Sequence, residues 1–326
     1  MSAVTARVVI GAPLYGQSRQ LRVALGSLLA QTYEDFALVL VDDRSPDDTV
    51  AVARELAGDD PRVSIHVNPR RLGMLANTNR AWQLSRALHP AAEFWALGSD
   101  HDIWRPAWMK RLVAALDANP RAVLAYPLTE RIDAVGRTVS GSFRFATEGV
   151  ADPRARLRKG LRSMVSGDMI YGLFRASALD GVGFYRPVLA PDRLLLSELA
   201  LQGEFVQVPE LLWSRRYVGL ASLRRQREVF WPQGAPARTR LPWWLVHTGA
   251  FAREHGVARA ALDYAPASAY FQLRSRALRA SNTIAAPAIK AALREPQVRR
   301  SVRRFALPLI RETREVLDRL VREADS

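Results

Sequence analysis

Short apolar runs alternate with helix-like periodic segments along the first two-thirds of the chain. Runs of strand length occur at 7–10, 36–41, 63–67, 94–97 and 122–126. Between them, apolar residues recur every three or four positions, as they do on the buried face of a helix. Four successive strand–helix units predict a doubly wound α/β fold, with a mostly parallel central sheet flanked by helices.

Later segments extend this pattern and then change it. The run 166–175 predicts another strand entering the core, 191–202 predicts a helix, and 204–210 alternates like an edge strand. Beyond about residue 220 the chain is rich in alanine and arginine, with helical spacing that prolines interrupt. We therefore expect an α/β domain over residues 1–220 and a basic, mostly helical C-terminal region over 221–326.

The composition is that of a globular protein without cysteine. The 326 residues are 48% hydrophobic, which suffices for one large core. The lack of cysteine excludes disulfides, thiolate zinc sites and cysteine nucleophiles. No run reaches the ~18 apolar residues of a membrane-spanning helix, and the N-terminus lacks the pattern of a signal peptide. The expected location is cytoplasmic.

The net charge of +15 is concentrated near the C-terminus. Residues 1–220 carry 27 Lys and Arg against 23 Asp and Glu, whereas 221–326 carry 20 against 9. No recognised nucleic-acid motif accompanies this charge, so no nucleic-acid partner is expected. The last helical segment, with Leu320 opposite Arg322, could lie peripherally on the anionic inner face of a membrane or pack on the main domain. The oligomeric state stays open.

Carboxylates follow two of the predicted strands. Asp42 and Asp43 end the run 36–41, and Asp100 and Asp102 follow the run 94–97. Ligands of open α/β sheets gather outside the carboxyl ends of the strands. Two aspartates separated by one residue there offer oxygen ligands to Mg²⁺ or Mn²⁺. A solvated turn with an aspartate capping the next helix is the plainer alternative.

Other residues near these strand ends suit a nucleotide. Asp42 or Asp43 could accept the imide N–H of a uracil-type base, and Arg71 could contact a diphosphate, although arginines are often ordinary surface charges. No G-x-G-x-x-G or Walker pattern is present, so the dinucleotide fingerprint and the phosphate loop are both unsupported.

An ordered set of short motifs resembles the family 2 glycosyltransferases, which have the GT-A fold. The set is Pro13-Leu14-Tyr15, Val41 to Asp47, Asn68 with Gly73 and Asn77, and Asp100-His101-Asp102. The resemblance covers roughly residues 6–217. It implies a catalytic domain that moves a sugar from a nucleotide-sugar donor, with UDP favoured, to a glycan, lipid-linked saccharide or small-molecule acceptor. It also implies a Mn²⁺ or Mg²⁺ cofactor.

The resemblance assigns roles to individual residues. Asp102 and Asp100 would bind the metal, and Asp192 would be the general base of an inverting reaction, although Pro191 stands where relatives commonly have glutamate. Two further departures are Gly16 in place of an asparagine and Arg215-Arg216-Tyr217 in place of a histidine. The expected donor-binding residues are Pro13, Tyr15, Asp42, Asp43, Arg71, Asn77, Ser99 and Asp100, and the acceptor-side candidates are Trp104, Asp168 and Glu198.

Other functions stay open on the sequence. A non-catalytic protein of the same fold could bind nucleotide sugars or glycans, although the presence of Asp100, Asp102 and Asp192 together argues against it. A metal-dependent hydrolase would release free sugar without needing an acceptor. An arginine-rich nucleic-acid binder is the least favoured, and its affinity would fall steeply with salt.

Overall fold

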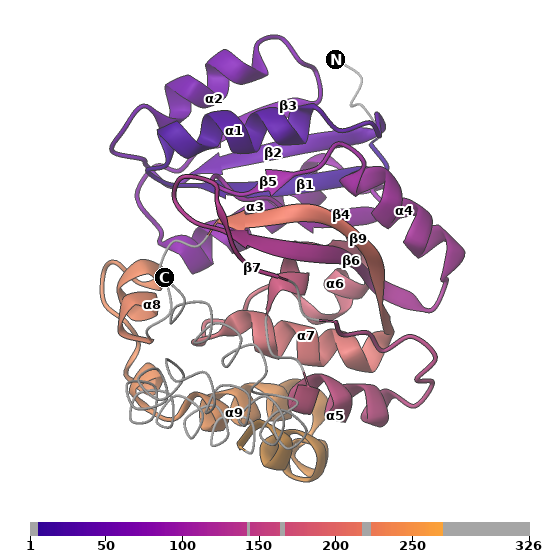
Figure 1. Ribbon diagram of the computed structural model, residues 1–326. Helices are drawn as coiled ribbons and strands as arrows, with labels where there is room; N and C mark the ends of the chain where they lie inside the picture. Colours follow the sequence, from indigo (N-terminus) through magenta and orange to yellow (C-terminus); the bar gives the residue numbers. More distant parts are fainter. Residues whose placement is uncertain (1–5, 142–143, 164–166, 217–222, 270–326) are drawn as a thin grey trace, which may run out of the picture. The chain divides into compact units, whose positions relative to one another are not determined.

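The computed structural model describes residues 6–141, 144–163, 167–216 and 223–269 (Figure 1). One compact unit spans Met1–Ala267. Residues 223–267 therefore group with the unit that contains the sheet, although the sequence placed a boundary near residue 220. The predicted amphipathic segment around Leu320 lies outside the described residues.

A nine-stranded sheet forms the centre of this unit, in the order β3-β2-β1-β4-β8-β6-β9-β5, with β7 paired to β6. The strands are β1 (Val8–Leu14), β2 (Phe36–Asp42), β3 (Val63–Val67), β4 (Phe94–Leu97), β5 (Ile103–Trp104), β6 (Ala122–Ile132), β7 (Thr138–Ser140), β8 (Leu173–Arg175) and β9 (Glu204–Arg216). The pairs β1–β2, β1–β4, β2–β3 and β6–β9 are parallel. The antiparallel pairs all involve the short strands β5, β7 and β8, which agrees with the predicted mostly parallel sheet.

One strand prediction needs correction, and another strand is longer than predicted. Asp168–Tyr171 forms a 3₁₀ turn, and only Leu173–Arg175 is a strand. At Gly172, which separates them, a side chain would lie 2.4 Å from the carbonyl oxygen of Ala125. The predicted edge strand 204–210 is the first part of β9, where the strand pairs with β6. The strand continues to Arg216 and pairs with β5 only at Trp213 and Ser214.

Helices cover both faces of the sheet (Figure 1). The helices α1 (Ser18–Leu29), α2 (Thr49–Ala57) and α4 (Trp108–Ala118) bury their apolar residues against one face. The helices α3 (Met74–Leu88), α6 (Ala176–Val182) and α7 (Pro191–Gln202) do so on the other. The spacing of Leu21, Leu25 and Leu28 on α1 is typical of this packing, since all three are buried.

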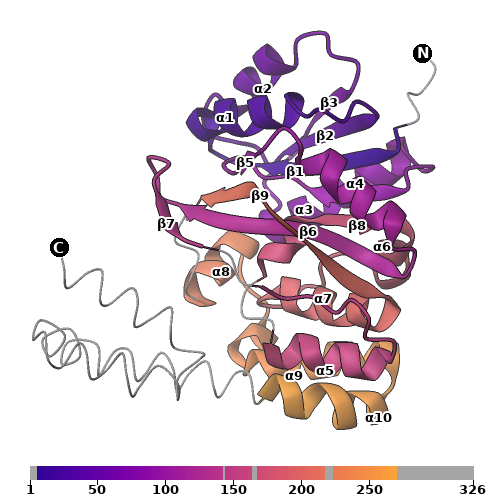
Figure 2. The same cartoon turned by 45° about the vertical axis from the view of Figure 1, so that its right-hand side comes forward.

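A further helical layer packs on α7 (Figure 2). The helices α5 (Pro153–Ser163) and α9 (Trp243–His255) meet α7 through an apolar cluster that includes Leu157, Leu194 and Phe251. The helix α8 (Leu223–Phe230), the short α10 (Val257–Arg259), a 3₁₀ turn at Ala237–Arg240 and a π-helical turn at Ala260–Tyr264 lie in the same part of the chain. None of the helices in the described ranges is long and apolar enough to cross a membrane.

The register of the parallel strands positions the candidate residues. Leu14 pairs with Asp42 across β1 and β2, and Gly11 pairs with Leu97 across β1 and β4. The three strands therefore end at the same edge, where the loops that carry Tyr15, Asp43 and Asp100 emerge together.

Candidate active site

The loop after β4 holds two carboxylates in different states. The Asp100 carboxylate accepts a hydrogen bond from the Tyr15 backbone N–H at 3.0 Å, and its other oxygen lies 2.6 Å from Nδ1 of His101. Asp102 is 1% exposed, and its Oδ1 accepts the backbone N–H of Arg216 at 2.8 Å. Its Oδ2 is buried and has no hydrogen-bond partner among the described residues.

This unpaired oxygen fits a divalent cation. A buried polar atom without a partner costs about 1–3 kcal/mol, and burial raises the pKa of Asp102. A cation would offset both effects. No cluster of three His, Cys, Asp or Glu suited to a metal occurs among the described residues. Two carboxylates that are completed by substrate phosphates and water are, however, the usual Mg²⁺ arrangement. Asp100 and Asp102 could hold such an ion.

Asp43 holds the loop that follows β3. Its Oδ1 accepts hydrogen bonds from Asn68 Nδ2 at 2.9 Å and from the Leu72 N–H at 2.7 Å, and its Oδ2 accepts the Gly73 N–H at 2.8 Å. Asn77 supports this arrangement, because its Oδ1 accepts a hydrogen bond from Asn68 Nδ2 at 2.8 Å. Asp43 and Asn77 therefore shape the loop that carries Arg71.

The remaining donor-side candidates lie around the same edge. Both Asp42 oxygens accept hydrogen bonds from Ser45, one of them from its N–H at 3.0 Å. The Arg71 guanidinium lies over the Tyr15 ring, 4.2 Å from its centroid, and its Nε is buried without a hydrogen-bond partner among the described residues. Ser99 Oγ accepts the His101 N–H at 3.3 Å. Pro13, in β1 two residues before Tyr15, is half-buried.

Asp192 stands at the beginning of α7, far from these loops in the sequence. Ala190, two residues earlier, has the left-handed backbone angles φ 49° and ψ 52°, which few non-glycine residues adopt. A Cβ atom placed on Gly167 would lie 2.0 Å from Asp192 Oδ2. The carboxylate is half-buried, and its Oδ2 packs against Gly167.

Tyr171 connects the two carboxylate groups electrostatically, and the sequence analysis missed it. Burial raises the pKa of its phenol, and the charges of Asp102, Asp100 and Asp192 raise it further. The ring stacks on Trp213 at 4.7 Å between centroids. The charges of both the metal candidates and Asp192 therefore act on Tyr171. It follows no motif, so only the fold could reveal its position.

Asp168 lies beside Tyr171 on the 3₁₀ turn. It is paired with Arg131 at 3.3 Å and forms a second ion pair with Arg215. The positive charge of Arg215 lowers the pKa values of both His101 and Asp102. The structure thus brings Asp168 to the same region as Asp102.

Two acceptor-side predictions are corrected. Trp104 is 2% exposed and packs in the core edge-on to Trp108, with 6.5 Å between ring centroids. Its strand β5 pairs with β9, which directs the ring beneath α4. Glu198 is fully buried on α7 and forms an ion pair with Arg186 at 3.2 Å. Neither side chain is accessible to an acceptor.

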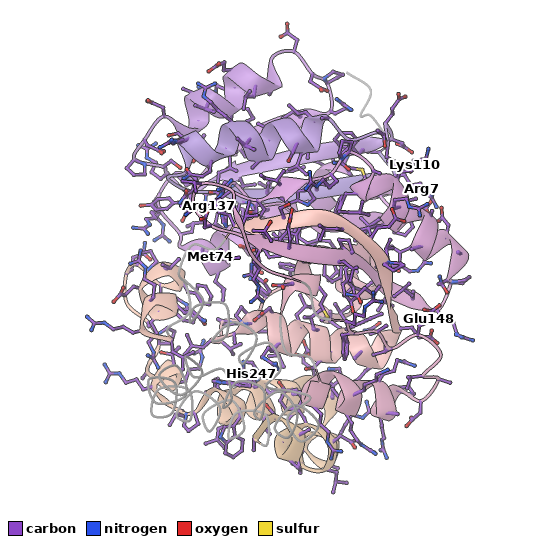
Figure 3. The ribbon with its side chains drawn as sticks, viewed as in Figure 1. Arg7, Met74, Lys110, Arg137, Glu148 and His247 are labelled. Carbon is purple, nitrogen blue, oxygen red and sulfur yellow. The ribbon has the colours of Figure 1, made fainter. Side chains whose placement is uncertain are left out.

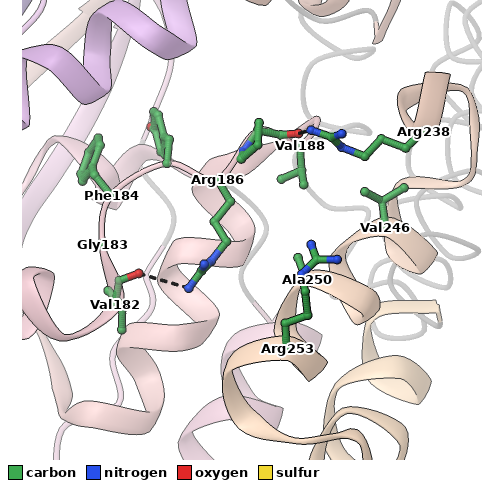
Figure 4. A pocket seen from close by; sticks show the side chains of 11 residues that line it. Val182, Gly183, Phe184, Arg186, Val188, Arg238, Val246, Ala250 and Arg253 are labelled. Carbon is green, nitrogen blue, oxygen red and sulfur yellow. Dashed lines mark hydrogen bonds between the residues drawn. The ribbon is translucent and has the colours of Figure 1, made fainter. Parts of the chain in front are cut away.

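A cavity of about 330 Å³ lies apart from these residues, between the segment 182–188 and α9 (Figure 4). Arg186, Arg238 and Arg253 contribute to its lining. None of the candidate site residues lines it. His247 on α9 (Figure 3) lies fully buried, with Nε2 2.7 Å from the Leu189 carbonyl oxygen, and burial lowers its pKa to about 4. It supports the chain that leads to Asp192.

Comparison with known proteins identifies the family. The family model described as glycosyl transferase family 2 matches residues 9–180, which is more than half of the chain. The chain belongs to this family. An uncharacterized glycosyltransferase of Haemophilus influenzae is 26% identical over 105 residues. That match covers 32% of this chain and 31% of the relative, so the chain spans about a third of that protein.

Solved glycosyltransferases have the same fold. The structure of S. aureus TarS 1–349 in complex with UDP-GlcNAc has a TM-score of 0.56 at 16% identity, over 81% of this chain and 71% of that one. The mannosyltransferase PcManGT from Pyrobaculum calidifontis, in complex with GDP-Man and Mn²⁺, also has a TM-score of 0.56 at 16% identity, over 96% and 84% of the two chains. The predicted GT-A fold is thereby confirmed.

Glu198 makes the stability of this family 2 protein depend on pH. Burial raises its pKa from 4.5 to about 7 despite Arg186. Between these values the folded state binds more protons than the unfolded state, so the free energy of unfolding should fall by up to about 3 kcal/mol as the pH rises from 4.5 to 7.

Urea unfolding of the wild type and Glu198→Gln at several values between pH 5 and 8 would measure this effect. The amide cannot lose a proton, so the variant should become more stable than the wild type as the pH rises. Parallel pH dependences of the two proteins would contradict the assignment.

Proposed function

We propose that the protein is an inverting glycosyltransferase that moves a sugar from a nucleotide-sugar donor to an acceptor hydroxyl. The observation that carries this proposal is the buried, unpaired Oδ2 of Asp102 beside Asp100, at the strand edge where Tyr15 and Arg71 meet. In a family 2 protein this arrangement suits the diphosphate of a donor and its accompanying cation.

The donor would lie along the ends of β1, β2 and β4. The base and ribose would contact the loops that Asp42, Asp43 and Asn77 hold, with Pro13, Tyr15 and Ser99 lining the same edge. Arg71 would contact the diphosphate through its unpaired Nε. The TarS complex contains UDP-GlcNAc and the PcManGT complex contains GDP-Man. The donor would be a UDP-sugar, which the family resemblance favours, with a GDP-sugar as the alternative.

The cofactor would be Mn²⁺ or Mg²⁺, and the PcManGT complex contains Mn²⁺. Asp102 and Asp100 would hold the ion. When bound, it supplies positive charge that stabilises the diphosphate as it leaves.

Asp192 would act as the general base. Its carboxylate takes the proton of the acceptor hydroxyl, whose oxygen forms a bond to the anomeric carbon as the bond from that carbon to the diphosphate oxygen breaks. A single in-line displacement inverts the configuration at that carbon. General-base assistance contributes roughly 10²–10⁴-fold to such a rate. Asp168, near Tyr171, would face the acceptor.

The acceptor would be a glycan, a lipid-linked saccharide or a small molecule with a free hydroxyl, as in cell-wall or polysaccharide biosynthesis. A cytoplasmic location and peripheral contact of the basic C-terminal region, residues 221–326, with an anionic membrane stay predictions.

Nucleotide binding tests the donor site. Isothermal titration with UDP and GDP, each with and without Mn²⁺, should give metal-dependent binding of one nucleotide to the wild type. Asp102→Asn keeps the size of the side chain but weakens the metal ligand, so it should reduce binding by at least roughly tenfold. Asp117→Asn, at an exposed ion pair with Arg7, is the control and should bind normally. A folded wild type that binds neither nucleotide would contradict the proposal.

Gly167→Ala tests the base without altering its chemistry. The new methyl group would occupy the space of Asp192 Oδ2, so the carboxylate must move. We expect kcat for donor turnover to fall by roughly 10²-fold or more, as in Asp192→Asn, with nucleotide affinity unchanged. Gly26→Ala, on α1 with open space around it, is the matched control. If Gly167→Ala has the kcat of the wild type while Asp192→Asn is impaired, the Asp192 carboxylate does not act from this position.

A further inference from the structure

The helix α8 and the turn after it touch both halves of the proposed active site. These residues, 223–234, come after the last strand of the sheet and outside the family match at 9–180. Their contacts with the donor loop (residues 70–73) and with the base loop (residues 189–192) are made by different side chains. Each contact can therefore be removed separately.

The contact with the donor loop is made by the end of α8. Gln233 Nε2 donates a hydrogen bond to the Arg71 carbonyl oxygen at 2.7 Å. Gly73 has φ 93°, and a Cβ atom there would lie 2.4 Å from the Phe230 carbonyl oxygen. Phe230 is 7% exposed. The donor loop is therefore held from inside by Asp43 and from outside by the segment 230–233.

The contact with the base loop is made by the middle of α8. Gln226 Oε1 accepts the backbone N–H of Ala190 at 3.2 Å. Ala190 is the residue with left-handed backbone angles that precedes α7. A strained conformation persists only where its surroundings hold it, and Gln226 supplies a bond that holds this one. Asp192 lies two residues further on.

The helix itself is anchored independently of both loops. The Arg227 guanidinium donates to the Thr239 carbonyl oxygen at 2.6 and 3.2 Å, and Thr239 is 2% exposed. A side chain on an anchored helix can hold a neighbouring loop in place, whereas a side chain on a frayed segment cannot.

We propose that residues 223–234 are a positioning element, in which Gln233 fixes the loop of Arg71 and Gln226 fixes the loop of Asp192. One helix thereby sets the distance between the diphosphate contact and the general base. Gln226 and Gln233 are positioning residues, since neither contacts the proposed substrates. The inference rests on the proposed function and adds a part of the chain to that site.

Two substitutions separate the two contacts. Gln233→Met keeps the length of the side chain but loses the donor, so the affinity for UDP or GDP with Mn²⁺ should fall roughly three- to tenfold, the range expected for one hydrogen bond. Gln226→Met should leave nucleotide affinity within about twofold but accelerate hydrogen exchange of the Ala190 amide roughly three- to tenfold. Gln226→Glu keeps an acceptor oxygen and should restore slow exchange. Gln202→Met, on the exposed end of α7, is the control.

A pair of glycines tests the packing against Phe230. Gly73 has φ 93° and ψ 154°, and Gly256, after α9, has φ 86° and ψ 150°. An alanine is equally strained at both, but only at Gly73 would it collide with a neighbour, since Gly256 has open space. Gly73→Ala should weaken nucleotide binding, whereas Gly256→Ala should lower the melting temperature alone.

The outcomes distinguish this inference from the proposed function. The inference would be overturned, and the proposed function left intact, by three results together. The wild type binds a nucleotide, Gln233→Met binds it as tightly as Gln202→Met does, and the Ala190 amide of Gln226→Met exchanges its hydrogen at the wild-type rate. A wild type that binds no nucleotide would overturn both. If Gly73→Ala does not fold, the glutamine variants still decide the question.

Discussion

Parallel pairing of β1 with β2 and with β4 is the constraint on which the site depends. Because β1 lies between the other two, their loops leave the sheet at one edge. The hydrogen bond from the Tyr15 N–H to Asp100 then joins the loops after β1 and β4 directly. A slip of one residue in this register would turn every side chain of a strand to the opposite face. The buried apolar residues on both faces therefore also fix the positions of the polar ones.

The buried carboxylates of Asp43 and Asp102 differ in their hydrogen bonds, which indicates different roles for the two residues. Both oxygens of Asp43 accept hydrogen bonds from backbone and amide N–H groups of the 68–73 loop. This carboxylate therefore stabilises the loop. Asp102 is equally buried but leaves one oxygen unpaired. Buried polar atoms are nearly always paired in folded proteins. Several buried side-chain atoms of the described residues lack a hydrogen-bond partner, Glu198 Oε1 among them, but the one on Asp102 lies beside Asp100 at the strand edge. In a family 2 glycosyltransferase this position would suit the metal of the donor complex.

The sequence predicted the features that depend on local pattern. Strand-end carboxylates and the beginning of α7 at Pro191 follow from short-range rules, and the structure brings Asp100 and Asp102 to one edge with Tyr15. Long-range packing decided the rest. Trp104 lies two residues after Asp102, and Glu198 lies on the same helix as Asp192. Pairing of β5 with β9 buries the first, and the second helical layer buries the other. Tyr171 and Gln226 carry no motif, and their neighbours come from other parts of the chain.

The central claim is that Asp102 holds the metal of the donor complex. A crystal structure of the protein with UDP or GDP and Mn²⁺, with anomalous diffraction recorded at the manganese edge, would test it most directly. The account predicts an anomalous peak about 2.0–2.5 Å from Asp102 Oδ2. A bound nucleotide whose metal lies away from Asp102, or a nucleotide seated in the cavity beside Arg186, would contradict it.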